Sequence, residues 1–296
     1  MLTVLIPTFH YNAVHLVKAI QEQCLRAGII FEIICQDDAS KSELNTKNEK
    51  INSLANCHFY TNIKNLGRGR NINSLVLKAK YDYVLLLDCD TLPTKDTFIQ
   101  KYLDEIKKEK AVVFGGIVYH SEKPKQKNSL RWVYGQKREA LSVALRKENP
   151  YFSTLTSNIL FKKKVFLSNP FNENIKNYGY EDVVWVKKLK EKSIIITHIE
   201  NPTFHLNLET SEIFIEKIHQ SLKNLLLISN LGLITATDNR ILRTYVRISN
   251  IGLAAFFSFI FATFHKKIKA NLVSNHPYLF LLDVYKLCYY CKINSK

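Results

Sequence analysis

The chain has 296 residues, which is too long for a minimal domain and suits one large domain or one domain with an appendage. A hydrophobic content of 46% allows a substantial core, and a formal net charge of +16 favours an anionic partner: nucleic acid, nucleotide phosphates or an acidic membrane surface. The six cysteines are scattered, and most lie within predicted helices or strands, which indicates reduced core thiols rather than a disulfide framework.

Two short segments bear on metal content and on location. Cys288 and Cys291 form a C-x-x-C pair, but no second Cys pair or His pair completes a zinc site. Residues 2–7 are apolar, yet the segment is short and lacks a basic n-region, so we expect no signal peptide and a catalytic part in the cytoplasm.

Strand and helix patterns alternate through the first third of the chain. In order they are a strand over 3–7, a helix over 12–27, a strand over 30–35, a weaker strand over 57–61, and a helix ending at Ala79 that leads into the apolar strand 83–87. This order predicts parallel strands with helices on both faces of the sheet.

Polar residues follow these strands or open the next helix. They are Thr8, Asp37, Asp38, the segment 67–70, Asp88 and Asp90. Because ligands of open α/β sheets bind at the carboxyl ends of the strands, we expect these residues to gather along one edge.

Asp88-Cys89-Asp90 follows directly on the buried strand 83–87. Side chains at i and i+2 of an extended chain point the same way, so the two carboxylates converge, and hard oxygen ligands suit Mg²⁺ or Mn²⁺. The alternative is a pair of solvated loop acids that cap the helix after Pro93.

Asp37 or Asp38 could accept hydrogen bonds from a base or a ribose, and Arg70 near a helix N-terminus could bind phosphate. The alternatives are that the Asp-Asp-Ala-Ser run only caps a helix and that Arg70 is a surface charge.

Four segments together resemble the successive motifs of family 2 glycosyltransferases with the GT-A fold, of the bacterial surface-polysaccharide type. They are Leu5-Ile6-Pro7-Thr8, Gln36-Asp37-Asp38-Ala39-Ser40, Asn65-Leu66-Gly67 with Arg70-Asn71, and Asp88-Cys89-Asp90. The resemblance covers roughly the first two hundred residues.

The resemblance implies a Rossmann-like, mostly parallel sheet flanked by helices, a nucleotide-sugar donor, most often a UDP-sugar, and Mn²⁺ or Mg²⁺. It also implies that the donor is bound by residues of these motifs: Pro7, Thr8, Asp37, Asp38, Asn65, Gly67, Arg70, Asp88 and Cys89. Asp90 would hold the metal. Cys89 departs from the small or acidic residue usual in the triplet, and its side chain should point away from the metal.

The second half of the chain must supply the acceptor chemistry. Residues 111–118 predict a strand with Gly115-Gly116 allowing close backbone approach, and 157–161 predict another strand. The basic, amphipathic segment 128–147 is either an exposed helix or a flexible arm over the acceptor site.

Glu181 and Asp182 open an amphipathic helix, where two acids also suit the helix dipole without any catalysis. The resemblance implies that this pair supplies the general base of an inverting transfer, with Asp182 as that base. Near the end of the same half, many GT-A enzymes carry a metal-binding His after the last strand, and His205 fits that place better than His198.

From Thr210 the composition becomes helical and apolar. The uncharged run 251–264 falls short of the roughly 20 residues needed to span a bilayer. Flanking basic and aromatic residues favour an interfacial element on anionic lipid, whereas a cap on the catalytic domain or a homo-oligomer contact is the alternative.

We therefore expect a catalytic domain over 1–210, with a nucleotide-sugar half over 1–118 and an acceptor half over 119–210, and a helical region over 211–296. The expected enzyme transfers a sugar to a glycan or lipid-linked acceptor at the inner face of the plasma membrane. A sugar-phosphate nucleotidyltransferase is an alternative, but no Gly-rich phosphate loop follows the first strand. A basic nucleic-acid-binding or membrane-binding protein is another, although no nucleic-acid-binding motif is present and nucleic acid is not expected.

Overall fold

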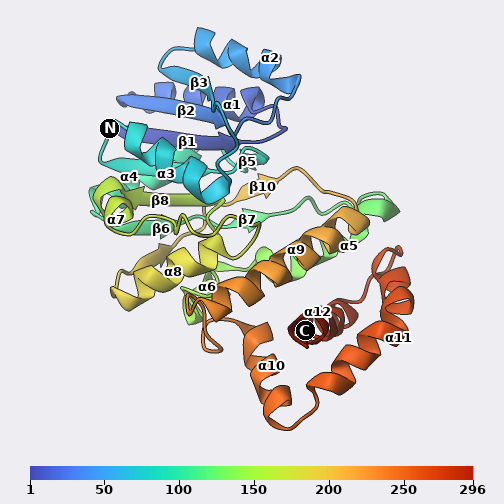
Figure 1. Cartoon of the computed structure of the whole chain (residues 1–296). Coiled ribbons are helices and arrows are strands. Elements are labelled where there is room, and N and C mark those ends of the chain that lie inside the picture. The colour runs from blue at the N-terminus through green and yellow to red at the C-terminus, as the bar shows by residue number, and fades with distance from the viewer. Residues whose placement is uncertain (296) are drawn as a thin grey trace. The chain divides into compact units, whose positions relative to one another are not determined.

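The computed structural model describes residues 1–295, except for the side chain of Gln126. The chain divides into two compact units (Figure 1). The first unit comprises Met1–Tyr119, Glu139–Lys176 and Trp185–Asn207. The second comprises His120–Arg138, Asn177–Val184 and the residues from Leu208 on.

A seven-stranded sheet forms the centre of the first unit, in the order β3-β2-β1-β4-β8-β6-β9. Its strands are β1 (Leu2–Thr8), β2 (Phe31–Asp37), β3 (Cys57–Thr61), β4 (Tyr83–Leu87), β6 (Val112–Phe114), β8 (Asn158–Lys162) and β9 (Ile196–His198). All paired neighbours run parallel except at β8, which is antiparallel to both β4 and β6. The parallel order expected for the first four strands is thereby confirmed.

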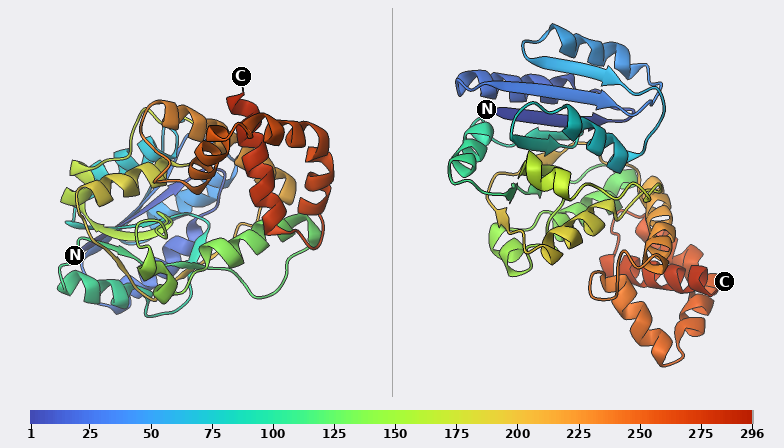
Figure 2. Two further views of the ribbon diagram at one scale, coloured as in Figure 1. Left: turned by 90° about the horizontal axis from the view of Figure 1, so that it is seen from below. Right: turned by 60° about the vertical axis from the view of Figure 1, so that its left-hand side comes forward.

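Alternate residues of each central strand face opposite sides of this sheet, so each side carries its own hydrophobic cluster. On one side Leu2, Val4 and Ile6 of β1 pack with α1 (Val14–Arg26) and α4 (Phe98–Lys107). On the other side Leu5 packs with α3, α7 and α8 (Figure 2). These helices are α3 (Arg68–Lys78), α7 (Lys163–Ser168) and α8 (Glu181–Glu191), and the short helices α2 (Leu44–Asn48) and η1 (Glu49–Ser53) precede β3.

A second, three-stranded sheet in the first unit has the order β5-β10-β7. Its strands are β5 (Thr91–Pro93), β7 (Ile117–Val118) and β10 (Thr203–His205). The strand expected over 111–118 is therefore wrong as a single element, because it divides at Gly115-Gly116 into β6 of the large sheet and β7 of the small one. Gly116 has φ +100°, and a Cβ on Gly115 would lie 2.5 Å from the Asn201 carbonyl oxygen.

The segment 128–147 is not one helix either. It comprises η2 (Gln126–Asn128), α5 (Ser129–Tyr134), the π-helical turn η3 (Gly135–Glu139) and α6 (Val143–Glu148). Nor is it exposed throughout, because Arg146 is only 2% exposed and donates hydrogen bonds to the backbone carbonyls of Phe114, Leu141 and Ile199. A buried guanidinium with several carbonyl acceptors fixes α6 against the first unit's large sheet.

The second unit is helical. Besides η2 and α5 it contains α9 (Ser211–Asn230), α10 (Arg240–Asn250), α11 (Ala254–Leu272) and α12 (Leu279–Asn294) (Figure 1). Its packing centres on rings, since His219 of α9 stacks on Tyr285 and Tyr289 of α12, and both tyrosines contact Phe261 of α11. Within residues 1–295 no single helix meets the length and hydropathy of a membrane span, although α10 and α11, bent by 115°, do so as a pair.

Candidate active site

The carboxyl ends of β1 and β2 bring four of the predicted donor-binding residues together. Pro7 pairs with Gln36, Thr8 pairs with Asp37, and the Asp38 amide donates to the Thr8 carbonyl at 3.0 Å. Because β1 and β2 are parallel, both chains leave the sheet at the same edge. Pro7, Thr8, Asp37 and Asp38 therefore form one continuous strip.

The Asp38 carboxylate organises the loop that leads into α3. It accepts hydrogen bonds from the backbone amides of Leu66 and Gly67, both at 2.8 Å, and from the Asn62 side chain at 2.9 Å. The Asn65 side chain in turn donates to the Asp38 carbonyl at 3.0 Å. Asp38 is 4% exposed, so its charge is held by protein donors, and the nucleoside contact expected for it stays a prediction.

Asp37 makes a local turn. Its carboxylate accepts from the Ser40 amide at 2.8 Å and from the Ser40 hydroxyl at 2.6 Å, and the side chain is fully buried. These bonds close a turn and cap no helix, because α2 begins only at Leu44 and its N-cap residue, Glu43, makes no side-chain capping bond. Asp37 thus fixes the direction of the chain as it leaves β2.

An arginine that the sequence reasoning did not select faces the acid triplet. Arg68, the first residue of α3, places its Nη2 atom 2.8 Å from Asp88 Oδ1, and both side chains are about 30% exposed. Arg70 instead donates from Nε and Nη2 to the Glu173 backbone carbonyl, at 3.0 and 2.6 Å. Gly67 is the N-cap of α3 and has φ +82°, a conformation that favours glycine. The Gly67-Arg68 pair at the start of a predicted helix was therefore the signal in the sequence that could have identified Arg68.

Asp90 and His205 are brought together by the small sheet. His205 on β10 pairs with Thr91 on β5, the residue directly after Asp90, and the Leu206 amide donates to the Asp90 carbonyl at 2.8 Å. Asp90 Oδ2 and His205 Nε2 lie 3.5 Å apart. The His205 ring also stacks on Tyr119, with ring centroids 5.4 Å apart.

These two atoms fit a divalent cation as a pair of ligands. Two ligands of one Mg²⁺, each at about 2.1 Å, stand roughly 3 Å apart, which is close to the 3.5 Å between Asp90 Oδ2 and His205 Nε2. Across residues 1–295 no group of three or more His, Cys, Asp or Glu side chains with metal-binding geometry is present. The remaining ligands of such an ion would therefore be substrate phosphate oxygens and water, as is usual for Mg²⁺.

Cys89 and Tyr11, which lie beside the two carboxylates of the triplet, are poor acids. Burial raises the pKa of the Cys89 thiol, and the carboxylates of Asp90 and Asp88 raise it further, so this thiol stays protonated. Its side chain packs against the hydrophobic cluster under β1. Burial, followed by Asp90 and Cys89, also raises the pKa of Tyr11, which places a neutral phenol beside Asp90 that the sequence did not indicate.

Glu181 and Asp182 begin α8, as the sequence predicted, but they belong to the second unit and not to the first. Gly179 and Tyr180 precede them with φ +98° and +68°, and Asp182 Oδ1 accepts from the Val183 amide at 2.8 Å. The turn is held by α9, because the Asn224 side chain donates to the carbonyls of Asn177 and Gly179. Both acids occupy the first turn of α8, where the helix dipole favours negative charge.

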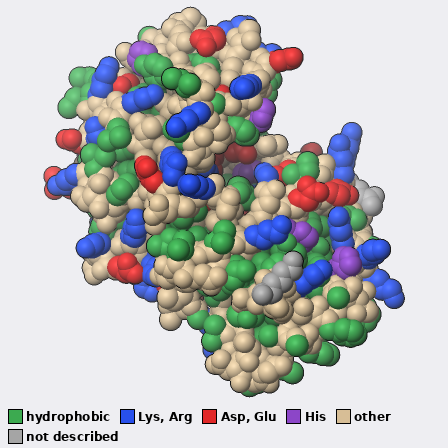
Figure 3. Space-filling model, in the orientation of Figure 1, with side chains coloured by type: hydrophobic (Ala, Val, Ile, Leu, Met, Phe, Trp, Pro, Cys, Tyr) green, Lys and Arg blue, Asp and Glu red, His purple; other side chains and the backbone are tan. Residues whose placement is uncertain are grey.

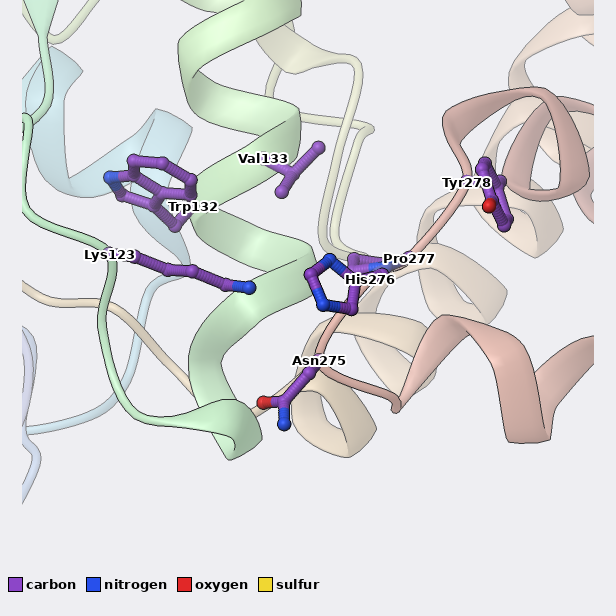
Figure 4. Close-up of a pocket in the computed structure, with 7 residues that line it drawn as sticks. All are labelled: Lys123, Trp132, Val133, Asn275, His276, Pro277 and Tyr278. Carbon is purple, nitrogen blue, oxygen red and sulfur yellow. The ribbon is translucent and has the colours of Figure 1, made fainter.

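The second unit also carries a shallow pocket of about 360 Å³ (Figure 4). Its lining combines aromatic, cationic and amide side chains without a carboxylate: Lys123, Trp132, Val133, Asn275, His276, Pro277 and Tyr278. The Trp132 indole N–H donates to the His120 carbonyl at 2.8 Å, which holds the ring in place. None of the residues predicted for the active site lines this pocket.

Comparison with known protein families identifies the family of this chain. The model of glycosyl transferase family 2 matches residues 3–171, which is more than half of the chain. A comparison with curated protein sequences finds no match.

Three solved structures are similar to the chain. The mannosyltransferase PcManGT from Pyrobaculum calidifontis, in complex with GDP-Man and Mn²⁺, has a TM-score of 0.55 and 13% identity over 77% of this chain and 64% of that chain. S. aureus TarS 1-349 has a TM-score of 0.50 and 17% identity over 99% and 90% of the two chains. A S. aureus TarS structure has a TM-score of 0.47 and 16% identity over 76% of this chain and 39% of that chain.

The present chain thus spans less than two thirds of the PcManGT chain and of the longer TarS chain. At these identities the likeness bears on the fold. Together with the family match it confirms the predicted α/β fold class of the GT-A type, with a large, mostly parallel sheet flanked by helices and a helical C-terminal part.

Proposed function

This chain belongs to glycosyl transferase family 2, and from that premise we propose that it moves a sugar from a nucleotide-diphosphate donor to a hydroxyl of a glycan or lipid-linked acceptor. The observation that carries the proposal is the edge of the first unit where β1, β2 and β4 end. There the Arg68–Asp88 ion pair and the Asp90–His205 pair meet at the acid triplet that follows β4.

For the donor we assign the nucleoside to the strip from Pro7 to Asp38 and to the loop of Asn65 and Gly67. A planar guanidinium binds diphosphate oxygens in two-point contacts, so Arg68 is our candidate for the diphosphate, with Asp88 orienting it. A UDP-sugar is the first choice of donor, as is common in the family. GDP-mannose is the second, because PcManGT is described in complex with GDP-Man and Mn²⁺.

For the metal we assign Asp90 and His205, with Mn²⁺ or Mg²⁺ as the ion. When bound, the cation supplies Lewis-acid neutralisation of the leaving diphosphate. Asp88 contributes by holding Arg68, and Tyr11 contributes a neutral neighbour that adds no competing charge beside Asp90.

For the chemical step we assign Asp182 as general base, with Glu181 as its acidic neighbour. The carboxylate takes the proton of the acceptor hydroxyl while that oxygen bonds to the anomeric carbon and the bond to the diphosphate oxygen breaks. Attack on the face opposite the leaving group inverts the anomeric configuration. The turn held by Asn224 fixes the direction in which Asp182 enters α8.

The proposal is tested with a panel of nucleotide-sugars, UDP-sugars and GDP-mannose included, incubated with and without Mn²⁺ or Mg²⁺ and with EDTA. We expect one donor to release its nucleoside diphosphate only with the metal, and NMR of the product to show an inverted anomeric centre. Release of pyrophosphate from a nucleoside triphosphate and a sugar phosphate would instead indicate a nucleotidyltransferase.

Asp182→Asn tests the base. We expect a loss of transfer of about a hundredfold or more with an unchanged donor Kd, because proton transfer fails while the donor site is intact. Glu212→Gln is the matched control, since Glu212 is an exposed acid in the first turn of α9. Equal loss of transfer and of donor binding in Asp182→Asn would contradict the assignment.

A further inference from the structure

The turn between α10 and α11 exposes a group of large apolar side chains. They are Val246, Ile251, Leu253, Phe256 and Phe259, here called the α10–α11 corner. Ile251 is 68% exposed, Phe256 is 56% exposed and Phe259 is 63% exposed. Single exposed apolar residues are ordinary, but a group on one turn marks a surface that another phase or partner covers.

Basic residues flank this corner on both helices. Arg240, Arg243 and Arg247 recur at helical spacing on α10, and all three are exposed. On α11 the exposed positions Phe256 and Phe259 are followed two turns later by exposed Lys266 and Lys267. Figure 3 shows hydrophobic side chains on the surface in the lower part of the view, where Figure 1 places the turn between α10 and α11.

The charged residues within this segment are all of one sign. Between Asp238 and Asp283 the sequence contains six Lys and Arg residues and no Asp or Glu. A second copy of the chain, docked by the same face, would bring like charges together around the apolar residues. A layer of anionic headgroups over hydrocarbon, in contrast, matches both features at once.

We propose that the α10–α11 corner docks on an anionic lipid surface. The five corner side chains enter the boundary between headgroups and acyl chains, and Arg247, Lys266 and Lys267 bind headgroup phosphates. The helices lie along the surface. This docking is independent of the transferase activity, and it places the second unit where a lipid-linked acceptor is found.

The test is co-sedimentation of the full chain with vesicles of phosphatidylcholine, with and without phosphatidylglycerol. We expect binding to the anionic vesicles that weakens with salt, and binding to phosphatidylcholine alone that is weaker by about tenfold or more. Phe256→Ser with Phe259→Ser should weaken binding by about tenfold or more, because two apolar rings leave the boundary region. The paired control is Ile195→Ser, which changes a residue of the first unit that is 74% exposed.

A second variant tests the charges. Arg247→Gln, Lys266→Gln and Lys267→Gln together should abolish the preference for anionic vesicles, whereas Lys18→Gln, Lys164→Gln and Lys190→Gln, which remove the same charge from exposed sites in the first unit, should preserve it. Unchanged thermal melting of each variant shows that it folds. The proposal is overturned if the wild-type chain binds neither vesicle or both equally, or if Phe256→Ser with Phe259→Ser binds as the wild type does. It is also overturned if light scattering shows a dimer that this double variant dissociates.

Discussion

At the scale of single residues, one carboxylate in the candidate site has a structural task that can be separated from ligand binding. Asp38 accepts three hydrogen bonds from the segment 62–67, two of them from backbone amides at the start of α3. The same loop delivers Arg68 to Asp88. The position of Arg68 therefore depends on Asp38, the acid that directly follows β2.

We predict that Asp38→Ala lowers the free energy of unfolding by roughly 2–4 kcal/mol, because three donors lose a charged acceptor that is itself buried. Urea denaturation measures this change. Asp96→Ala is the control, since Asp96 is highly exposed and its ion pair with Arg26 is long, at 3.8 Å. Equal stability losses in the two variants would show that Asp38 does not organise the loop.

Arg68 and Arg70 lie two residues apart, but we expect opposite effects on nucleotide binding and on stability when each is replaced. Arg68→Ala should raise the Kd for UDP or GDP by roughly tenfold or more with little loss of stability, because its ion pair with Asp88 is partly exposed. Arg70→Ala should lower stability, because the Glu173 carbonyl loses two hydrogen bonds, and should spare the Kd. Calorimetric titration with the nucleotide measures the Kd, and thermal melting measures the stability. The reverse pattern would indicate that Arg70, and not Arg68, binds the diphosphate.

At the scale of elements, the strands with uninterrupted apolar runs were predictable and the broken ones were not. The apolar strand predicted over 83–87 is observed as Tyr83–Leu87, and the helix predicted at Glu181 begins there. The segment 111–118 divides between two sheets at Gly115. Tyr102, Asn158 and Asn201 approach the backbone there so closely that only glycine fits. Those three residues are distant in sequence, so no local pattern could reveal the division.

The close approach at Gly115 gives a prediction for the junction between the two sheets. Gly115→Ala should lower the free energy of unfolding by about 2 kcal/mol or more, because its Cβ would lie 2.5 Å from the Asn201 carbonyl oxygen and 2.6 Å from Asn158 Nδ2. Gly28→Ala is the matched control, since it has φ +61° but no atom within 4 Å of its Cβ, and should cost only about 1 kcal/mol of backbone strain. Chemical denaturation compares them, and a larger loss in Gly28→Ala would contradict the packing explanation.

At the scale of the whole molecule, the composition change at Thr210 indicates the helical C-terminal region but not the full second unit. That unit also takes in His120–Arg138 and Asn177–Val184, which the sequence order places inside the first unit's range. The grouping of Thr8, Asp37 and Asp38 could be predicted, because the carboxyl ends of parallel strands meet at one edge of the sheet. The Asp90–His205 pair also depends on β10 pairing with β5, and strands of three residues are too short for periodicity to predict.

A buried histidine links stability of the first unit to pH. Burial, followed by the Arg146 guanidinium, lowers the pKa of His198 to about 4. Its Nε2 atom lies 3.0 Å from the Pro150 carbonyl oxygen and therefore donates, while Nδ1 lies 3.5 Å from Arg146 Nη1, so a second proton would face a cation. Thr154 and the Phe114 ring complete the surroundings, and Lys147 adds positive charge that lowers the pKa further.

Between pH 6.5 and pH 4 the unfolded chain binds a proton at His198 that the folded chain does not, so the free energy of unfolding should fall as the pH falls through this window. The loss attributable to His198 should approach about 3 kcal/mol near pH 4, at about 1.4 kcal/mol for each pH unit, and should vanish above pH 7. His198→Gln should flatten this slope by close to one proton, because glutamine stays neutral throughout, while His15→Gln controls for the loss of an exposed histidine. Urea denaturation at successive pH values measures the slope, and an unchanged slope in His198→Gln would show that the imidazole is not held neutral beside Arg146.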